Sequence, residues 1–361
     1  MSLSEQITKL VQNPVCFLSD TPVAGDGIAI SSRIRLARNL EGYPFPCNMT
    51  TALKKEVASM VRSAAVKSRV FPAKSAYFIY PEELEENARQ ILIERRLAST
   101  QFIKEPAGTL LIATPDETSS IMVNEEDQLR IQCMAPGFVL DELWQKISAI
   151  DTKLNKNLDY CFDNQYGFLT ACGSNVGTGM RASVMLHLPA LVATGLINPT
   201  LEGISQLHLA VRGLRGEGSK NHGNLFQISN QYTLGISEED SISSLKAAII
   251  RLIEGEKAAR EKLLDTKRNM VFDKIGRAYG MLKYAYTLPL DEAFYAISCL
   301  RLGVDLGMFN AVDTAKVNLL QIALQPGHLG CKIENDCTST NCDEKRAFLC
   351  RTILKSGPGN Y

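Results

Sequence analysis

The sequence predicts an α+β fold, in which helices flank a β-sheet, followed by a separate helical domain. Three observations carry this prediction. Short β-rich runs bounded by Gly, Asn, Asp or Pro fill the middle of the chain. Helical periodicity lies before and between them, without a regular βαβ repeat. After about residue 238 the strand patterns stop and only helical patterns follow. We therefore expect residues 1–263 to form one domain and residues 264–361 the other.

The elements of the first domain follow one another along the chain. Residues 51–70 and 82–97 have helical periodicity, with charges of both signs on the outer face. Two more helices are expected at 139–156 and 181–195, between the strands. The predicted strands are 109–115, 119–125, 129–135, 168–174, 207–213 and 224–231.

The second domain begins within one long helical pattern over residues 237–282. Ser237 opens this pattern as an N-cap, and acidic residues lie just inside the first turn. Further helical patterns follow at 290–308 and 316–324. We therefore expect this domain to consist of helices only.

The totals of the chain exclude several classes of protein. Its 361 residues are 45% apolar, enough for a large core and two domains. Lys plus Arg equals Asp plus Glu at 39 each, so we expect neither nucleic acid nor membrane as a partner. The N-terminus lacks a secretory signal, and no apolar stretch is long enough to cross a bilayer. Ten cysteines without an export signal indicate reduced thiols, and we expect a cytoplasmic protein.

Three arginines within six residues mark the segment Ser-Ser-Arg-Ile-Arg-Leu-Ala-Arg-Asn at 31–39. In an extended strand Arg33 and Arg35 share one face, while Ile34 and Leu36 point into a core. Two neighbouring guanidinium groups form a good receptor for a multiply charged anion. The alternative is a basic edge strand that discourages pairing between sheets. The spacing alone leaves both interpretations open.

Arginine recurs at other strand ends. The residues are Arg130, Arg181 and Arg212. The glycine-rich stretch 172–181 has neither the spacing of a P-loop nor that of a dinucleotide-binding fingerprint. If these segments converge, arginines supply the phosphate site that a glycine loop supplies elsewhere. Glu126 and Glu217 are then the carboxylates beside that site.

These motifs, in this order, resemble the phosphagen (guanidino) kinases. The matching stretches are SSRIRLARN, NEEDQLRI, CGSNVGTGMRASV, RGLRGEG and the strand that contains ISN. Within that family the chain is most similar to the bacterial protein-arginine kinases of the McsB type. The stretches that carry this closer likeness are RASVMLHLPAL, LRLGVDLGM and QPGHL.

The resemblance implies a fold and a domain order. Residues 1–263 would be an ATP:guanido phosphotransferase catalytic domain with an antiparallel sheet flanked by helices. Residues 264–361 would be a helical C-terminal domain of the dimerisation and phosphoarginine-binding type. Phosphagen kinases carry a helical domain before the Ser-x-Arg-x-Arg strand, and we expect the 30 residues before Ser31 to be too few for it.

The resemblance also implies roles for the charged residues. The residues expected around the ATP phosphates are Arg33, Arg35, Arg130, Arg181 and Arg212. Glu126 and Glu217 would clamp the acceptor guanidinium and take a proton as the N–P bond forms. Cys172 would help to align that group. Asp127 would either order a water molecule bound to the metal or be a buried structural carboxylate. Mg²⁺ would be held mainly by the nucleotide phosphates, so no protein metal site is expected.

The implied activity is transfer of the ATP γ-phosphate to arginine side chains of proteins, for a stress response or regulated proteolysis. The implied partners are proteins with exposed arginine, a McsA-type activator, a ClpC-type protease and further copies of this chain, as a homodimer or larger oligomer. Two alternatives stay open: a kinase for free arginine, and an inactive scaffold that binds phosphoarginine.

A phosphoarginine pocket in the C-terminal domain of this family reads Arg-Asp-x-x-Arg-Ala. This chain keeps Asp343 and Arg346 but has Cys342 in place of the first arginine. One phosphate-binding guanidinium is therefore missing. We expect a degenerate site that binds phosphoarginine weakly.

Overall fold

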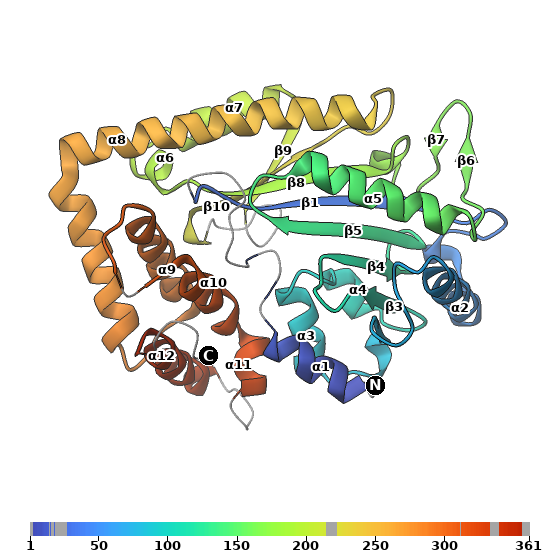
Figure 1. The fold of residues 1–361 in the computed structure, drawn as a ribbon, viewed down its shortest axis with the longest axis horizontal. Helices are drawn as coiled ribbons and strands as arrows, with labels where there is room; N and C mark the ends of the chain where they lie inside the picture. The colour runs from blue at the N-terminus through green and yellow to red at the C-terminus, as the bar shows by residue number, and fades with distance from the viewer. Residues whose placement is uncertain are drawn as a thin grey trace.

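The fold is built around an eight-stranded antiparallel sheet, seen in the computed structural model in Figure 1. The structure describes residues 3–13, 15, 18, 27–213, 222–310, 312–332 and 339–355. The strands lie in the order β2-β3-β4-β5-β1-β8-β10-β9. Their bounds are β1 Ala29–Arg38, β2 Tyr77–Ile79, β3 Leu110–Ala113, β4 Ser119–Val123, β5 Leu129–Pro136, β8 Met180–His187, β9 Leu209–Gly213 and β10 Leu225–Asn230. A separate hairpin pairs β6 (Phe162–Asp163) with β7 (Gly167–Phe168).

Helices cover both faces of the sheet and form the C-terminal region (Figure 1). Before the last strand they are α1 Leu3–Gln12, α2 Thr51–Lys67, α3 Glu86–Glu94, α4 Thr100–Lys104, α5 Leu140–Asn155, α6 Pro189–Ala193 and α7 Ile197–Gln206. After it come α8 Glu238–Tyr284, α9 Leu290–Asp305, α10 Thr314–Ala323, α11 Pro326–Lys332 and α12 Ser339–Lys355. None of these helices combines the length and the apolar composition that crossing a membrane requires.

One face of the sheet is apolar and packs against α5 and the first half of α8. Ile34 and Leu36 of β1 are fully buried there, together with Val184 of β8. The alternate side chains, Arg33 and Arg35, are partly exposed on the opposite face. The alternation predicted for this strand is therefore confirmed. Because the apolar side chains must stay buried, the strand cannot shift by one residue, and this keeps the arginines on the opposite face.

The opposite face is covered in two parts. Over β2, β3 and β4, buried side chains such as Leu111 and Met122 pack with Leu10 of α1 and Ile91 of α3. Beyond these strands α9, α10 and α11 lie below the sheet in Figure 1. The arginine-bearing strands β5, β1, β8 and β9 follow β4 in the strand order, with β10 between β8 and β9.

The helix predicted over 181–195 is wrong. Met180–His187 is strand β8, paired with β1 on one side and β10 on the other. Because a central strand is buried on both faces, its apolar run shows little alternation and resembles a helical pattern. Helix begins only after the strand, as the short α6.

The long helix α8 begins as the sequence predicts. The Ser237 side chain accepts a hydrogen bond from the backbone N–H of Asp240, which caps the first turn. The helix bends at Lys267, whose backbone is not helical (φ −141°, ψ 32°). The predicted domain boundary at 263/264 falls inside α8, a few residues before this bend, and stays a prediction.

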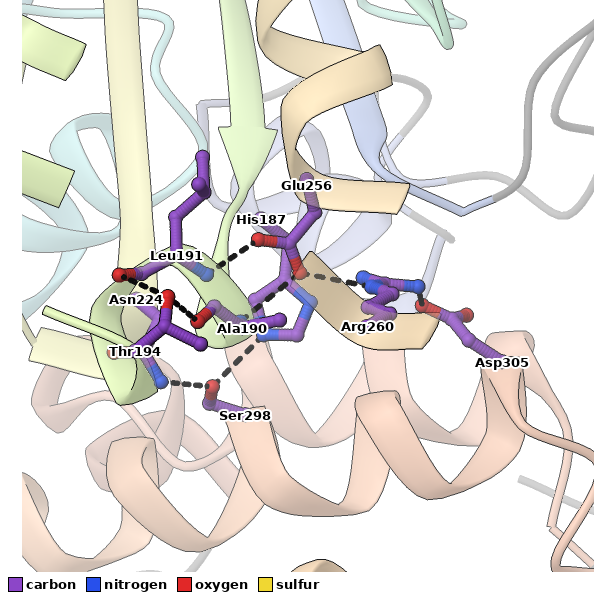
Figure 2. A network of polar contacts seen from close by, with 9 residues as sticks. All are labelled: His187, Ala190, Leu191, Thr194, Asn224, Glu256, Arg260, Ser298 and Asp305. Carbon is purple, nitrogen blue, oxygen red and sulfur yellow. Dashed lines mark hydrogen bonds and ion pairs between the residues drawn. The ribbon is translucent and has the colours of Figure 1, made fainter. Parts of the chain in front are cut away.

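A buried carboxylate joins α8 to the sheet and to α9 (Figure 2). Glu256 accepts hydrogen bonds from the backbone N–H groups of Ala190 (3.0 Å) and Leu191 (2.9 Å) at the start of α6. It also accepts one from Arg260 Nε (2.8 Å), and Arg260 Nη1 lies 3.1 Å from Asp305 Oδ2 at the end of α9. These bonds satisfy a carboxylate that is fully buried.

A second set of contacts lies beside the first in Figure 2. His187 ends β8, and its Nε2 atom lies 2.8 Å from the hydroxyl of Ser298 on α9. The same hydroxyl accepts a hydrogen bond of 2.8 Å from the Asn224 amide, just before β10. The C-terminal helices are therefore joined to the sheet through buried polar contacts as well as apolar packing.

Candidate active site

The arginines predicted to hold phosphate lie on one face of the sheet. Arg35 of β1 pairs directly with Arg181 of β8, and Arg33 lies two residues along on the same face. Arg130 of β5 pairs with Ala37, which places it diagonally opposite Arg35. Three neighbouring strands thus bring four guanidinium groups together.

The fifth arginine reaches the same face through β10. Arg212 of β9 pairs with Gln227 of β10, and Gln227 Oε1 accepts a hydrogen bond of 3.1 Å from Arg33 Nη2. The sheet therefore unites all five residues, although they come from four strands. The convergence expected from the sequence is present.

Four of these five side chains, all but Arg181, line a cavity of about 700 Å³. Its lining includes Arg33, Arg35, Arg130, Arg212, Gln132 and Gln227 from the sheet, and Leu290, Phe294, Gln321, Ile322, Gln325 and Pro326 from the C-terminal helices. The volume lies in the range of small-molecule sites, about 300–1,000 Å³. A more open hollow of about 660 Å³ at Val70, Thr114 and Lys146 contains none of the predicted site residues.

Several guanidinium groups lie close together in this cavity. Burial and the nearby guanidinium groups of Arg96, Arg130, Arg181 and Arg212 lower the pKa of Arg33 to about 9. Burial and neighbouring arginines also hold the pKa of Arg35 well below its ordinary value. The Nε atom of Arg35 is buried without a hydrogen-bond partner among the described residues. A bound polyanion would offset this repulsion and supply the missing acceptor, so the residues fit the phosphates of ATP.

Arg96 also lines the cavity, and sequence reasoning missed it. It lies just after α3 in the left-handed backbone region (φ 60°), and its carbonyl oxygen accepts a hydrogen bond of 3.0 Å from Gln132. Burial lowers its pKa to about 10. The sequence shows it only as one charge in a charged helical pattern, so nothing local distinguishes it.

Arg130 is paired within the protein. It forms an ion pair with Glu125, which also accepts a hydrogen bond from Ser99. Burial raises the pKa of Glu125, but Arg130, the hydrogen bonds and Arg35 together bring it below its ordinary value. Glu125 was not singled out in the sequence, and it offsets part of the positive charge of the cavity.

Glu126 and Cys172 meet at one end of the arginine face. The Cys172 thiol lies close enough to lower the pKa of the Glu126 carboxyl, and its sulfur lies 3.1 Å from the Ser174 hydroxyl. Burial and the carboxylates of Asp127 and Glu125 raise the pKa of Glu126. A raised pKa makes a carboxylate a better proton acceptor at neutral pH. Glu126 is exposed, so an acceptor can reach it.

Asp127 takes the structural role of the two expected for it. Its Oδ1 atom accepts hydrogen bonds from Asn39 Nδ2 (2.8 Å) and from the backbone N–H of Ala171 (2.7 Å). The side chain is buried. Asp127 therefore holds the turn that carries Cys172 against the end of β1.

Comparison with known proteins places the chain in a family. The family model described as ATP:guanido phosphotransferase, C-terminal catalytic domain, matches residues 56–259. The model of the protein-arginine kinase McsB C-terminal domain matches residues 268–360. The protein-arginine kinase of Halalkalibacterium halodurans is 43% identical over 91% of this chain and 92% of that protein. That of Desulforamulus reducens is 42% identical over 99% of both. The chain belongs to the protein-arginine kinase family.

Comparison with solved structures gives separate evidence for the fold. A duplicated taurocyamine kinase from Schistosoma mansoni, with bound transition state analog components, has a TM-score of 0.60 at 24% identity. The match covers 69% of this chain and 35% of that one. A lombricine kinase has a TM-score of 0.58 at 22% identity, over 71% of this chain and 76% of that one. The guanidino-kinase fold expected from the sequence is confirmed.

Two further predictions concern Glu217 and the phosphoarginine site of the C-terminal region. Glu217, predicted as the second acceptor carboxylate, lies outside the described residues. In the C-terminal region Arg346 is buried, and it donates hydrogen bonds to the backbone carbonyls of Leu324 (Nε, 2.9 Å) and Leu288 (Nη1, 2.8 Å) and to Asp343. These bonds tie α12 to its neighbours. Phosphoarginine binding by Asp343 and Arg346 stays a prediction.

Metal binding by side chains has no candidate in the described part of the chain. No group of three or more His, Cys, Asp or Glu residues there could hold an ion. Among the acids beside the arginines, Glu125 forms an ion pair with Arg130, and Asp127 accepts a hydrogen bond from Asn39.

Proposed function

We propose that the protein transfers the γ-phosphoryl group of ATP to arginine side chains of other proteins. The observation that carries this proposal is the arginine face of the sheet, which ends at Glu126 and Cys172. Its many guanidinium groups suit a triphosphate, and its carboxylate suits an acceptor of opposite charge. Membership of the protein-arginine kinase family supports the same acceptor.

The nucleotide half of the site works by charge and position. In phosphoryl transfer the protein mainly aligns the reactants and neutralises the phosphate oxygens. Arg35, Arg130 and Arg181, which lie nearest to Glu126 along the strands, would hold the transferring phosphate. Arg33 and Arg212 would hold the other two phosphates of ATP. Mg²⁺, when bound, would neutralise further phosphate charge while held by the nucleotide.

The acceptor half has to make a guanidinium nucleophilic. Its ordinary pKa exceeds about 12, and its lone pairs are delocalised. We assign Glu126 to orient the acceptor and to take the proton that its nitrogen loses as the N–P bond forms and the bond to ADP breaks. Cys172, which lies beside Glu126, would help to align the acceptor. Glu217 is proposed as the second carboxylate of this clamp.

The family likeness alone supports our proposals for the substrates, the partners, the oligomeric state and the cellular role. We propose proteins with exposed arginine as substrates, a McsA-type activator and a ClpC-type protease as partners, and a homodimer or larger homo-oligomer as the working form. A cytoplasmic location and a role in stress response or regulated proteolysis belong to the same proposal.

The acceptor class is tested by competition. Wild-type protein is incubated with MgATP and either an arginine-rich protein or free L-arginine, and ADP formation is measured. We expect ADP to form with the protein acceptor, and an excess of free arginine to slow it little. Faster turnover with free arginine would identify a small-guanidine kinase instead. Binding of phosphoarginine without any turnover would identify an inactive scaffold.

A further inference from the structure

The C-terminal region meets the cavity through a buried contact between α3 and α11. Glu94, the last residue of α3, accepts hydrogen bonds from the backbone N–H groups of Gly327 (2.7 Å) and His328 (3.0 Å) at the start of α11. The His328 ring adds a third contact, with Nδ1 2.6 Å from Glu94 Oε2. The side chains of Glu94 and His328 are 2–3% exposed. We call this set of contacts the α3–α11 clamp.

The clamp depends on a close approach of two helices. A Cβ atom on Gly327 would lie 3.0 Å from Glu94 Oε2 and 3.0 Å from the backbone nitrogen of Ile91. One of these neighbours is backbone and cannot move aside alone. Glycine at this position therefore lets α11 lie against α3, and it explains part of the QPGHL stretch that the activity itself does not use.

The same contact builds the wall of the nucleotide cavity. Glu94 lines the cavity, and Arg96 follows it by two residues. On the other side of the clamp, Gln325 and Pro326 line the cavity directly before Gly327. Moving α11 away from α3 would displace both sides of this wall.

We propose that Glu94 is a positioning residue for ATP, which seats the C-terminal helices as one wall of the nucleotide site. The inference rests on the proposed function, because it takes the cavity to be the ATP site. ATP affinity then depends on how the C-terminal region is docked, although the phosphate-binding arginines all lie outside that region.

Simple electrostatics makes the opposite prediction for the same residue. Glu94 is an acid at a cavity crowded with arginine, so removing its charge should strengthen the binding of a triphosphate. The clamp account predicts weaker binding, because glutamine offers one acceptor oxygen and turns an N–H donor toward the start of α11. The direction of the change therefore separates the two explanations.

The test uses two unrelated disruptions of the clamp in the full chain. Glu94→Gln removes acceptors, whereas Gly327→Ala keeps every polar group and inserts a methyl group between the helices. The controls are Glu86→Gln, an exposed acid on the same helix, and Gly280→Ala, a helical glycine with open space around its Cβ position. For each protein we would measure the Kd of MgATP by calorimetry, thermal unfolding, and the KM values for ATP and for a protein acceptor.

We expect Glu94→Gln and Gly327→Ala each to raise the Kd and KM for ATP by about tenfold, as loss of one charge-assisted hydrogen bond would. The KM for the protein acceptor and both controls should stay near wild type. Unchanged or tighter ATP binding in folded Gly327→Ala or Glu94→Gln would overturn the inference while leaving the kinase assignment intact. Wild-type protein that binds no ATP would overturn both.

Discussion

Glu126 and Asp127 are neighbours in the chain and have different surroundings. Asp127 is buried, and its Oδ1 atom accepts hydrogen bonds from Asn39 and from the backbone N–H of Ala171. Glu126 is exposed beside Cys172, and burial and neighbouring acids raise its pKa. Burial raises the pKa of Asp127 too, so the difference between the two is access: of this pair, Glu126 is the carboxylate that an incoming acceptor can reach.

The raised pKa of Glu126 predicts a shifted pH profile. A base acts in its deprotonated form, so kcat/KM should fall as pH drops through its pKa. Because that pKa is raised, the acid limb should lie above 4.5, the ordinary value for glutamate. The measurement is kcat/KM for a protein acceptor against pH, with the Kd of ATP followed over the same range as a control. An acid limb at or below the ordinary value would contradict this role.

Cys342 predicts weak binding of phosphoarginine in the C-terminal region. A thiol cannot replace the charge-assisted hydrogen bonds of an arginine, and each such bond contributes about 1.5–3 kcal/mol. We expect Cys342→Arg to raise the affinity for free phosphoarginine by about tenfold or more. Calorimetric titration measures this, with Cys47→Arg as a control for added charge at an exposed position. Tight binding by wild type, with no gain on substitution, would place the pocket elsewhere.

The sequence could identify the arginines of β1, β5, β8 and β9 because each lies in a motif next to a strand. Arg96 could not be found this way, since it enters the cavity through the tertiary approach of α3 to the sheet. Glu125 was hidden for a different reason. It lies in the same motif as Glu126, and only the side-chain geometry shows that Glu125 pairs with Arg130.

At the scale of single elements, β1 carries function on one face and stability on the other. Arg38, at its end, points to the face opposite Arg33 and Arg35. Its Nε and Nη2 atoms lie 3.1 Å and 2.8 Å from Asp151 Oδ2 on α5, and its guanidinium stacks 3.5 Å from the centre of the Phe168 ring. The Arg38 side chain is 2% exposed. This pair fastens the edge of the arginine strand to α5.

Removing one partner of a buried ion pair leaves an uncompensated charge. We expect Asp151→Asn to lower the free energy of unfolding by about 3 kcal/mol, the lower end for buried pairs, because asparagine keeps one oxygen. The matched control is Asp273→Asn, which breaks an exposed pair with Arg277 on α8 and should cost about 0–1 kcal/mol. Chemical denaturation measures both. Equal losses in the two variants would show that Arg38 does not need its partner.

Strand β8 shows where pattern reading fails for an element. Its two neighbours in the sheet and the layers above and below bury nearly every residue, so polar alternation is reduced to Arg181, Ser183 and the buried His187. Whether a strand lies at the edge or in the centre of a sheet depends on the whole sheet, so the residues of the strand alone do not show it. The antiparallel order of the strands was likewise available only through the family resemblance.

At the scale of the molecule, the C-terminal helices are joined to the sheet by buried polar groups. His187 contacts Ser298 there, and burial with the charges of Arg301 and Arg260 holds the pKa of His187 well below its ordinary 6.5. The folded protein therefore keeps this histidine neutral at a pH where the unfolded chain protonates it. This contribution to stability is complete above pH 6.5 and is lost as the pH falls below it.

This junction predicts a stability change that one substitution should remove. At pH 5.5 protonation of His187 in the unfolded chain costs the fold about 1.4 kcal/mol relative to neutral pH. His187→Gln keeps a polar contact for Ser298 and cannot titrate, so its loss of stability between pH 7.5 and 5.5 should be smaller by about that amount. Denaturant unfolding at the two pH values measures the difference. Identical losses in both proteins would contradict a neutral buried histidine.

The most direct test of the account is to locate the phosphate that the protein transfers. Wild type and Glu126→Gln are incubated with MgATP and an arginine-containing protein, and the modified residues are mapped by mass spectrometry without acid treatment. We predict acid-labile phosphate on arginine with wild type, and a rate lower by about 10²- to 10⁴-fold with Glu126→Gln at unchanged ATP affinity. Phosphate on serine, threonine or histidine, or equal transfer by the two proteins, would contradict the assignment of this site.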